Sequence, residues 1–130
     1  MSTKVGILGS GMVGQILANG FIGLGHEVMI GTSDKNKYAQ LAEKTAGKAK
    51  VGSFADAAGF GQIIVFAVKG TGAEKVLQSA GAANLAGKTV IDTTNPISDD
   101  PPVDGVLKYF TSLRSTCVFV IAPQTYLLIL

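Results

Sequence analysis

A glycine-rich segment near the amino terminus carries the clearest chemical signal in this sequence. Gly9, Ser10, Gly11, Met12, Val13 and Gly14 fit the spacing G-x-G-x-x-G, between the apolar run 5–8 and a stretch of helical periodicity. We expect Gly9 to allow a tight turn, Gly11 to let a diphosphate approach the backbone, and Gly14 to bring a helix close to a sheet. The first-turn N–H groups of that helix would face the diphosphate oxygens. The segment predicts a dinucleotide-binding loop; the alternative is a glycine-rich turn without a ligand.

The end of the second predicted strand indicates which dinucleotide fits. An NAD site usually carries Asp or Glu there, about 20 residues after the glycines, to bind the ribose hydroxyls. Here Thr32 and Ser33 follow the strand, and their hydroxyls can donate to a 2′-phosphate, while Lys35 and Lys37 can add positive charge. This pattern favours NADP(H) over NAD(H). Two alternatives stay open: the hydroxyls could cap a helix beside solvated lysines, or Asp34 could bind the ribose.

Two later segments should border the same ligand, because ligands of such sheets lie beyond the carboxyl ends of the strands. Val68 and Lys69 begin a glycine-containing loop after the strongest strand signal, and Lys69 could add a charge. After the next strand, Thr94 and Asn95 could hydrogen-bond a nicotinamide ribose or carboxamide, and Pro96 fixes the chain direction. The alternatives are a solvent-exposed lysine and an ordinary turn.

The side chains needed for hydrolysis or metal binding are not grouped in the sequence. His26, the only histidine, precedes the second strand, away from the strand ends, and is expected to be a surface residue. Cys117 is the only cysteine, which excludes an internal disulfide and a cysteine-rich zinc site. Hydride transfer needs little beyond the orientation of two rings, since the coenzyme carries the chemistry. The pattern therefore fits a redox role with no metal site and with catalytic residues unassigned.

The elements that would position these residues alternate between strands and helices. Short apolar runs predict strands, and helical periodicity bounded by glycine or serine predicts helices. The predicted strands are 5–8, 28–30, 50–51, 63–68, 89–92 and 118–121, and the predicted helices are 13–24, 37–46, 53–58 and 73–80. Such alternation implies parallel strands with right-handed crossovers. The expected fold is α/β, a doubly wound parallel sheet of the Rossmann type.

The composition is that of one folded domain. The chain has 130 residues, 47% apolar and 15% charged, with a net charge of +2, so neither a disordered chain nor a nucleic-acid-binding protein is indicated. The absence of an apolar run of about eighteen residues and of a signal-peptide core favours a cytoplasmic location without membrane association. We expect a dinucleotide-binding domain over residues 1–112 and an atypical apolar tail over residues 113–130.

The last twenty residues, 111–130, differ from the rest: they contain no glycine, acid or lysine, and Arg114 is their only charge. One hypothesis is a premature end through truncation or a frameshift, with residues 114–130 outside the original frame. The other is a short natural variant in which residues 118–121 supply a sixth strand. The apolar tail could also support a homodimer, because an exposed apolar end tends to be covered.

Three segments together resemble one known family. They are residues 4–14, Gly25-His26-Glu27-Val28 leading to Gly31-Thr32-Ser33, and residues 90–96 ending in Asp92-Thr93-Thr94-Asn95-Pro96. Residues 3–97 resemble the NADP-dependent oxidoreductases that use the deazaflavin coenzyme F-420, whose nucleotide domain also occurs in related metalloreductases. The resemblance implies hydride exchange between NADP(H) and a small-molecule deazaflavin or flavin co-substrate. It also implies that the glycine loop binds the diphosphate, that Thr32 and Ser33 bind the 2′-phosphate, and that residues 94–96 lie near the nicotinamide.

One departure from the family concerns the 2′-phosphate, because the family's arginine after Gly-Ser/Thr is Ser33 here.

Two other functions stay open. The chain could be an NADP(H)-binding module without a complete substrate site, a sensor or a remnant, which would bind NADPH without turnover. An S-adenosylmethionine methyltransferase also has glycine-rich loops, but it would carry an acid where Thr32 stands.

Overall fold

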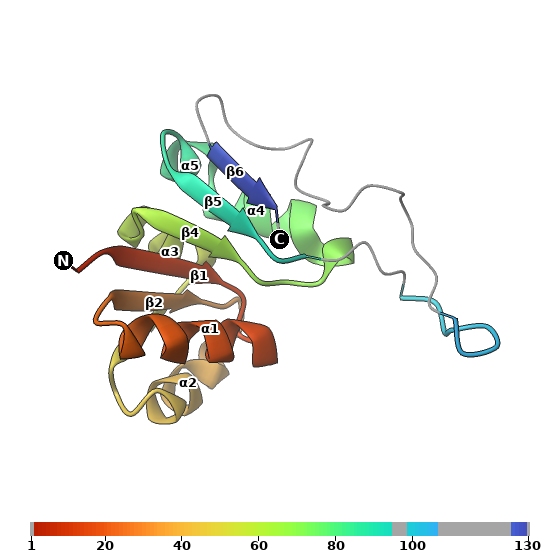
Figure 1. Cartoon of the computed structure of the whole chain (residues 1–130), viewed down its shortest axis with the longest axis horizontal. Helices are drawn as coiled ribbons and strands as arrows, with labels where there is room; N and C mark the ends of the chain where they lie inside the picture. The colour runs from red at the N-terminus through yellow and green to blue at the C-terminus, as the bar shows by residue number, and fades with distance from the viewer. Residues whose placement is uncertain (1, 95–98, 107–125, 130) are drawn as a thin grey trace.

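The computed structural model describes residues 2–94, 99–106 and 126–129 (Figure 1). Its strands are β1 (Lys4–Leu8), β2 (Glu27–Gly31), β3 (Ala49–Gly52), β4 (Ile63–Phe66), β5 (Thr89–Asp92) and β6 (Tyr126–Ile129). Its helices are α1 (Met12–Gly23), α2 (Tyr38–Lys44), α3 (Phe54–Phe60), α4 (Ala73–Ala80) and α5 (Ala82–Leu85), with 3-10 turns η1 (Lys35–Lys37) and η2 (Gly70–Gly72).

The strands form one parallel sheet in the order β3-β2-β1-β4-β5-β6. The chain moves outward from β1 through β2 to β3, then crosses back to β4 and continues to the other edge (Figure 1). The predicted doubly wound Rossmann-type fold is confirmed. In such a sheet the order reverses between β1 and β4, and this reversal opens a crevice at the carboxyl ends of the strands.

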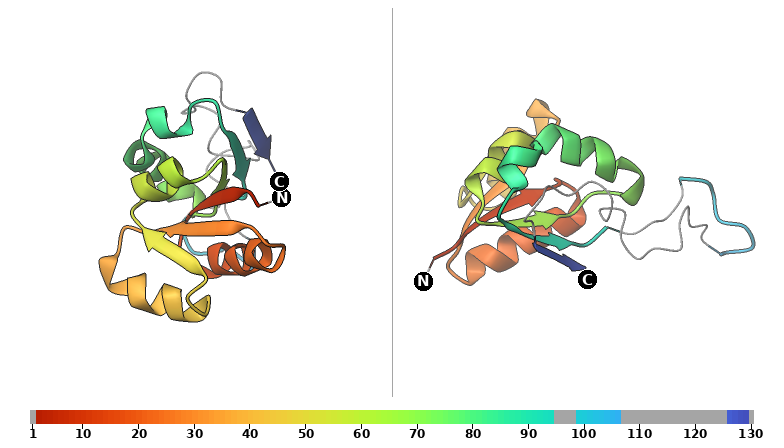
Figure 2. Two further views of the ribbon diagram at one scale, coloured as in Figure 1. Left: turned by 90° about the vertical axis from the view of Figure 1, so that its left-hand side faces the viewer. Right: turned by 90° about the horizontal axis from the view of Figure 1, so that it is seen from above.

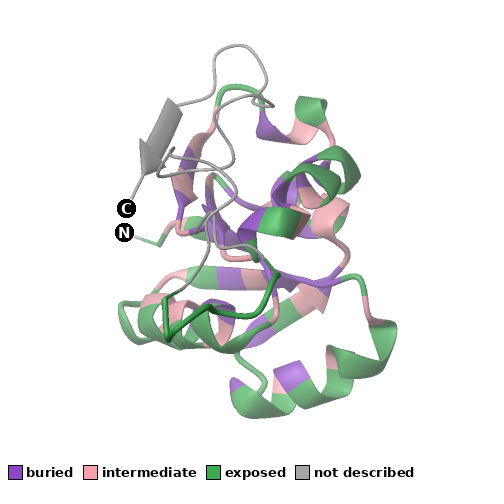
Figure 3. Cartoon of the chain, turned by 90° about the vertical axis from the view of Figure 1, so that its right-hand side faces the viewer, coloured by how far each residue is buried: buried purple, intermediate pink, exposed green. Residues whose placement is uncertain are grey.

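Two apolar layers hold the helices on opposite faces of the sheet. One buried cluster joins Ala18 of α1 and Leu41 of α2 to the strands, and the other joins Leu77 of α4 and Leu85 of α5 to the opposite face. Figure 2, right, shows the red-orange α1 on one side of the sheet and the green α4 and α5 on the other. Buried segments run along the strands, whereas the outer sides of the helices are exposed (Figure 3). The sheet therefore serves as the rigid support for the loops at its edge.

Most predicted elements are confirmed, and the bounds of α4 and β5 are as predicted. β4 ends at Phe66, two residues before the predicted end. The Ala67 N–H donates to the Leu8 carbonyl, and the pairing with β1 stops there because the β1 segment turns away at Gly9. The short helix α5 was not predicted. The predicted strand 118–121 lies outside the described residues; the sixth strand of the described sheet is β6, which pairs with β5.

His26 is more constrained than a free surface residue, although it does lie at the amino end of β2, away from the strand carboxyl ends. Its Nδ1 accepts a hydrogen bond from the Thr3 backbone N–H at 3.1 Å, and its ring meets Phe21 edge-on at 6.1 Å. It ties the start of β1 to the end of α1. Within the described part of the chain, no helix has the length and apolar character needed to span a bilayer.

Candidate functional site

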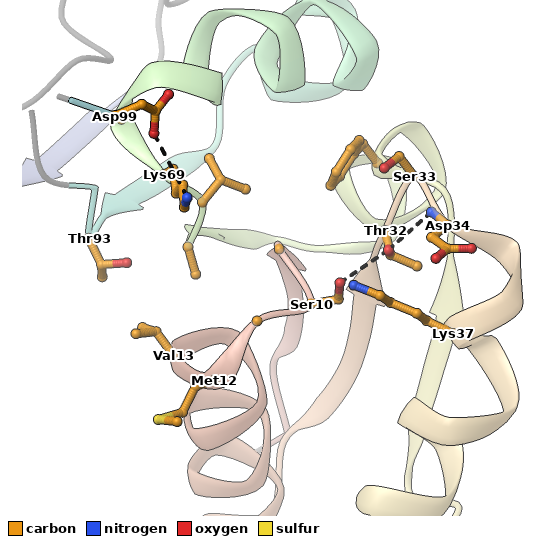
Figure 4. A pocket seen from close by; sticks show the side chains of 16 residues that line it. Ser10, Met12, Val13, Thr32, Ser33, Asp34, Lys37, Lys69, Thr93 and Asp99 are labelled. Atoms are coloured by element: carbon orange, nitrogen blue, oxygen red, sulfur yellow. Dashed lines mark hydrogen bonds and ion pairs between the residues drawn. The ribbon is translucent and has the colours of Figure 1, made fainter. Parts of the chain in front are cut away.

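A cleft of about 690 Å³ lies at the carboxyl edge of the sheet, where the strand order reverses. Its walls come from the β1–α1 loop, the segment after β2, the start of α3, and the loops after β4 and β5 (Figure 4). The lining residues are Gly9, Ser10, Gly11, Met12, Val13, Thr32, Ser33, Asp34, Lys37, Phe54, Ala67, Val68, Lys69, Gly70, Thr93 and Asp99.

Most of the predicted site residues come together in this cleft. Gly9 to Val13, Thr32, Ser33, Lys37, Val68 and Lys69 all line it. Gly14 is buried behind the loop, and Thr94 is buried next to the turn after β5; neither lines the cleft. Asn95 and Pro96 lie outside the described residues, so their predicted contacts with nicotinamide stay predictions.

The glycine loop depends on two close backbone approaches. Gly9 has φ +135°, which side chains rarely tolerate, and a Cβ there would overlap the Ala67 carbonyl oxygen. A Cβ on Gly14 would overlap the Gly9 carbonyl oxygen, so glycine is required for α1 to begin so close to the turn. These two contacts set the position of the first turn of α1 relative to β1 and β4.

Gly11 differs from its neighbours, because a Cβ built on it meets no protein atom within 4 Å. It is the N-cap of α1, in extended conformation, and it borders the cleft. The first-turn N–H groups of a helix have no carbonyl partner within it, and the first turn of α1 contains no acidic residue. This open approach to helix N–H groups fits an anionic group such as a diphosphate.

Hydrogen bonds connect the glycine loop to the end of β2. Ser10 Oγ donates to Thr32 Oγ1 at 3.1 Å, and the Asp34 N–H donates to the same oxygen at 3.2 Å. Gln15 Nε2 donates to the Ser10 carbonyl at 2.8 Å. Thr32 is buried and its hydroxyl oxygen accepts the hydrogen bonds from Ser10 and Asp34, so the hydroxyl hydrogen remains for a further acceptor.

The charged groups beside Thr32 have different surroundings. Asp34 accepts a hydrogen bond from the Asn36 N–H at 2.9 Å and caps η1, so its carboxylate has a local structural role. The exposed Lys37 extends its ammonium toward Ser10 (Figure 4). Within the described residues that ammonium has no ion-pair or hydrogen-bond partner. It is therefore available to an anion in the cleft.

The opposite wall combines apolar side chains with a charged pair and a threonine. Val68 is half-buried, and the Lys69 ammonium pairs with Asp99 at 3.8 Å, with both side chains mostly exposed. Thr93 Oγ1 donates to the Phe66 carbonyl at 2.7 Å and lines the cleft. Thr94, predicted to face the ligand, donates its N–H to Asp92 Oδ1 at 2.8 Å and is buried.

Four lining residues were not predicted: Phe54, Ala67, Thr93 and Asp99. Two others, Asp34 and Gly70, were considered only as an alternative ribose ligand and as part of a glycine-containing loop. Ala67 was assigned to the strand 63–68, and Asp99 had no predicted role in the site. Phe54 follows the helix cap Ser53, so sequence periodicity assigned it to a helix start without indicating what it would face. Its place in the cleft arises because β3 lies beside β2, which no local pattern specifies.

The pKa shifts that the structure supports lie outside the cleft. The Ser53 backbone N–H and hydroxyl group lower the pKa of Asp56 by hydrogen bonding its carboxylate, in a capping box that begins α3. Partial burial lowers the pKa of Lys88, whose ammonium donates to the Ala58 and Gly59 carbonyls. Both groups stabilise the ends of α3. Among the described residues no three His, Cys, Asp or Glu side chains gather as a metal site would require.

The family can be stated from a sequence match that spans the glycine loop and the strands β1 to β5. A family model described as "NADP oxidoreductase coenzyme F420-dependent" matches residues 4–96. The chain belongs to this family. The comparison with curated proteins gave no match.

Solved structures support the family assignment. An Arthrobacter sp. FB24 protein, described as a candidate F420-dependent NADP reductase, is 33% identical with a TM-score of 0.70, over 81% of this chain and 52% of its own. A candidate oxidoreductase from Pseudomonas putida KT2440 is 27% identical with a TM-score of 0.61, over 72% and 32%. Pyrroline carboxylate reductase from Plasmodium falciparum, solved with NADP bound, is 22% identical with a TM-score of 0.57, over 75% and 35%, and shares the fold. The chain described here thus spans about half the length of the Arthrobacter protein.

Proposed function

We propose that this chain binds NADP(H) and belongs to an oxidoreductase that transfers a hydride between NADP(H) and a deazaflavin or flavin-type acceptor. Family membership supports the class of reaction. The observation that carries the coenzyme assignment is the single cleft that combines the glycine loop with Thr32, Ser33 and Lys37. The two sets of residues suit the two phosphate groups of NADP(H), because one offers helix N–H groups and the other offers hydroxyls and a cation.

The diphosphate would lie against the first turn of α1. Gly11 leaves that turn open, and Met12 and Val13, the first residues of a helix without a first-turn acid, line the cleft. The helix dipole adds about 0.3–1 kcal/mol of favourable interaction with an anion at this end.

The 2′-phosphate would lie at the end of β2. Ser33 is exposed, Thr32 keeps one hydroxyl hydrogen, and the Lys37 ammonium supplies the positive charge that the family's arginine would bring. Asp34, which also lines the cleft, is the group that would instead favour an NAD ribose, and one of its oxygens accepts from the Asn36 N–H in the cap of η1. These contacts favour NADP(H) over NAD(H).

The hydride-transfer end would lie toward the loops after β4 and β5. Met12 and Val13 are 77% and 53% exposed at the rim of the cleft, and apolar side chains of this kind suit the flat ring of an acceptor. When bound, the coenzyme would exchange a hydride with the acceptor, while water supplies or takes up the balancing proton. The residues of this chain would orient the rings, and they need no acid–base pair for that role.

Calorimetric titration with NADPH and NADH, followed by turnover assays with deazaflavin, flavin and ferric acceptors, tests this proposal. We expect NADPH to bind at least tenfold more tightly than NADH, and turnover with a deazaflavin or flavin. NADPH binding without any turnover would favour the binding-module alternative. Equal and weak affinity for both nucleotides would contradict the 2′-phosphate assignment.

The remaining expectations about partners and location are part of the same proposal. We propose a small-molecule redox co-substrate as the partner, without nucleic acid or membrane, and a homodimer in solution. Sedimentation analysis of the purified chain tests the homodimer. The cytoplasmic location stays a prediction.

A further inference from the structure

Among the described residues that line the cleft, Phe54 is the one with an aromatic side chain. Its side chain is half-buried and packs against the same buried cluster as Val68, which lines the cleft from the loop after β4. One side of the Phe54 ring is thus supported by the core, while the residue also borders the cleft beside the end of β2. Nothing in the site described so far uses this ring.

The backbone around Phe54 is held on three sides. The capping box, in which Ser53 and Asp56 exchange two hydrogen bonds of 3.1 Å, fixes the first turn of α3. The Thr32 N–H donates to the Gly52 carbonyl at 3.0 Å, so the ends of β2 and β3 are joined immediately before Phe54. Gly31 leaves room for this approach, because a Cβ there would lie 3.1 Å from the Phe54 Cα. An aromatic ring on so fixed a backbone is pre-organised for a flat ligand.

We propose that the Phe54 ring is the platform on which the adenine of NADP(H) stacks. This inference rests on the proposed function. The 2′-phosphate and the adenine are attached to neighbouring carbons of one ribose, so a phosphate beside Thr32, Ser33 and Lys37 places the base within one sugar of that end. Phe54 lines the cleft at the same end, and a phenyl face suits the face of any nucleobase.

The other flat rings of the reaction fit this place less well. The nicotinamide and the acceptor must meet at one end of the coenzyme, and the diphosphate separates that end from the adenosine. Because the glycine loop lies on β1, between the β2–β3 side and the β4–β5 side of the sheet, Phe54 is on the adenosine side. The acceptor ring therefore belongs near Met12 and Val13, and the adenine near Phe54.

The Phe54→Leu variant tests the platform, since leucine retains an apolar side chain and removes the aromatic face. The probes are NADPH and 2′,5′-ADP. The second probe retains the adenine and the ribose with its 2′- and 5′-phosphates, and it lacks the nicotinamide half of the coenzyme. We expect Phe54→Leu to weaken both by the same factor, about tenfold, and Phe54→Tyr to restore both. The matched control is Phe60→Leu, the same change at the far end of α3, where the ring meets Lys4 and Lys50 and lies outside the cleft.

Unchanged affinity of Phe54→Leu for 2′,5′-ADP, or an equal loss in Phe60→Leu, would overturn the inference. If the variant does not fold, nuclear Overhauser effects between the unaltered protein and bound NADPH provide the test. We expect contacts between the Phe54 ring and adenine H2 or H8. Contacts between that ring and the nicotinamide instead would overturn the inference. Failure of the proposed function can be distinguished from failure of the platform. If the unaltered protein binds no NADPH, both the proposed function and the platform are refuted. If it binds NADPH and the Phe54 variants bind it equally well, only the platform is refuted.

Discussion

The same added methyl group should lower ligand affinity at Gly11 and stability at Gly14, two glycines of one loop. Gly11 is in an extended conformation that any residue adopts, with φ −74° and ψ −172°, and a Cβ there meets no protein atom within 4 Å. A Cβ on Gly14 would overlap the Gly9 carbonyl oxygen and lie 3.6 Å from Ile7 Cγ2. One methyl group should therefore obstruct the ligand and the other should obstruct the fold.

For Gly11→Ala we expect little change in stability. Alanine is a poorer N-cap than glycine by up to about 1 kcal/mol, and it lowers the entropy of the unfolded chain by a similar amount, about 0.4–1 kcal/mol. The methyl group occupies the space through which the diphosphate would approach the backbone. We expect at least a tenfold loss of NADPH affinity, about 1.4 kcal/mol, and a larger loss for Gly11→Val.

For Gly14→Ala the overlap falls on a backbone oxygen, which cannot rotate away. Overpacking of this kind costs about 1–3 kcal/mol, and the better helix propensity of alanine offsets about 1 kcal/mol of it. We expect a net loss of up to about 2 kcal/mol, visible as a lower Tm of several degrees.

Thermal unfolding by circular dichroism and calorimetric titration with NADPH measure the two effects separately. Gly20→Ala is the matched control: the residue lies in α1, a Cβ there meets nothing within 4 Å, and it is outside the cleft. It should gain about 1 kcal/mol of stability with unchanged binding. Wild-type NADPH affinity in Gly11→Val would refute the assignment of the loop to the diphosphate, and an unchanged Tm in Gly14→Ala would refute the packing argument.

Four further predictions each follow from a single contact. Lys37→Met should weaken NADPH binding about tenfold, the loss of one charge-assisted contact, and leave NADH binding unchanged in parallel titrations; equal losses would argue against a 2′-phosphate contact. Ser53→Ala should cost about 1 kcal/mol in urea unfolding, because it removes the cap of α3. The folded-state pKa of Asp56 is lowered, so its contribution to stability is present above the ordinary pKa of 3.8 and is lost as the pH falls through the folded value. Asp56→Asn should flatten that acid limb of the unfolding profile. Lys69→Ala should change stability by less than about 0.5 kcal/mol, since its ion pair with Asp99 is exposed; a larger change would show a role beyond that pair.

The parts of the fold that sequence predicted best are those with local signals. α4 lies between glycines and has a clear apolar stripe, and β5 is a short run of β-branched residues, so both were predicted with the observed bounds. The glycine loop was predictable because strand, glycines and helix occur in one continuous segment. α5 is only one turn long, set off by the positive φ of Gly81, and such a turn has no periodicity to detect.

The parts of the site that sequence missed depend on contacts between distant segments. β4 ends at Phe66 because Gly9 turns away beside Ala67, a contact between two strands. Thr94 is buried while Thr93 lines the cleft, because the turn after β5 is closed by the Asp92 carboxylate. A sequence indicates which residues end a strand, but the side from which each one faces a ligand is set by its neighbours in space.

A crystal structure of the chain with NADPH tests the central claim most directly. We expect diphosphate oxygens within hydrogen-bond distance, about 2.7–3.2 Å, of the backbone N–H groups in the first turn of α1, beside Gly11. A coenzyme bound elsewhere, or only solvent against that turn at saturating NADPH, would contradict the account.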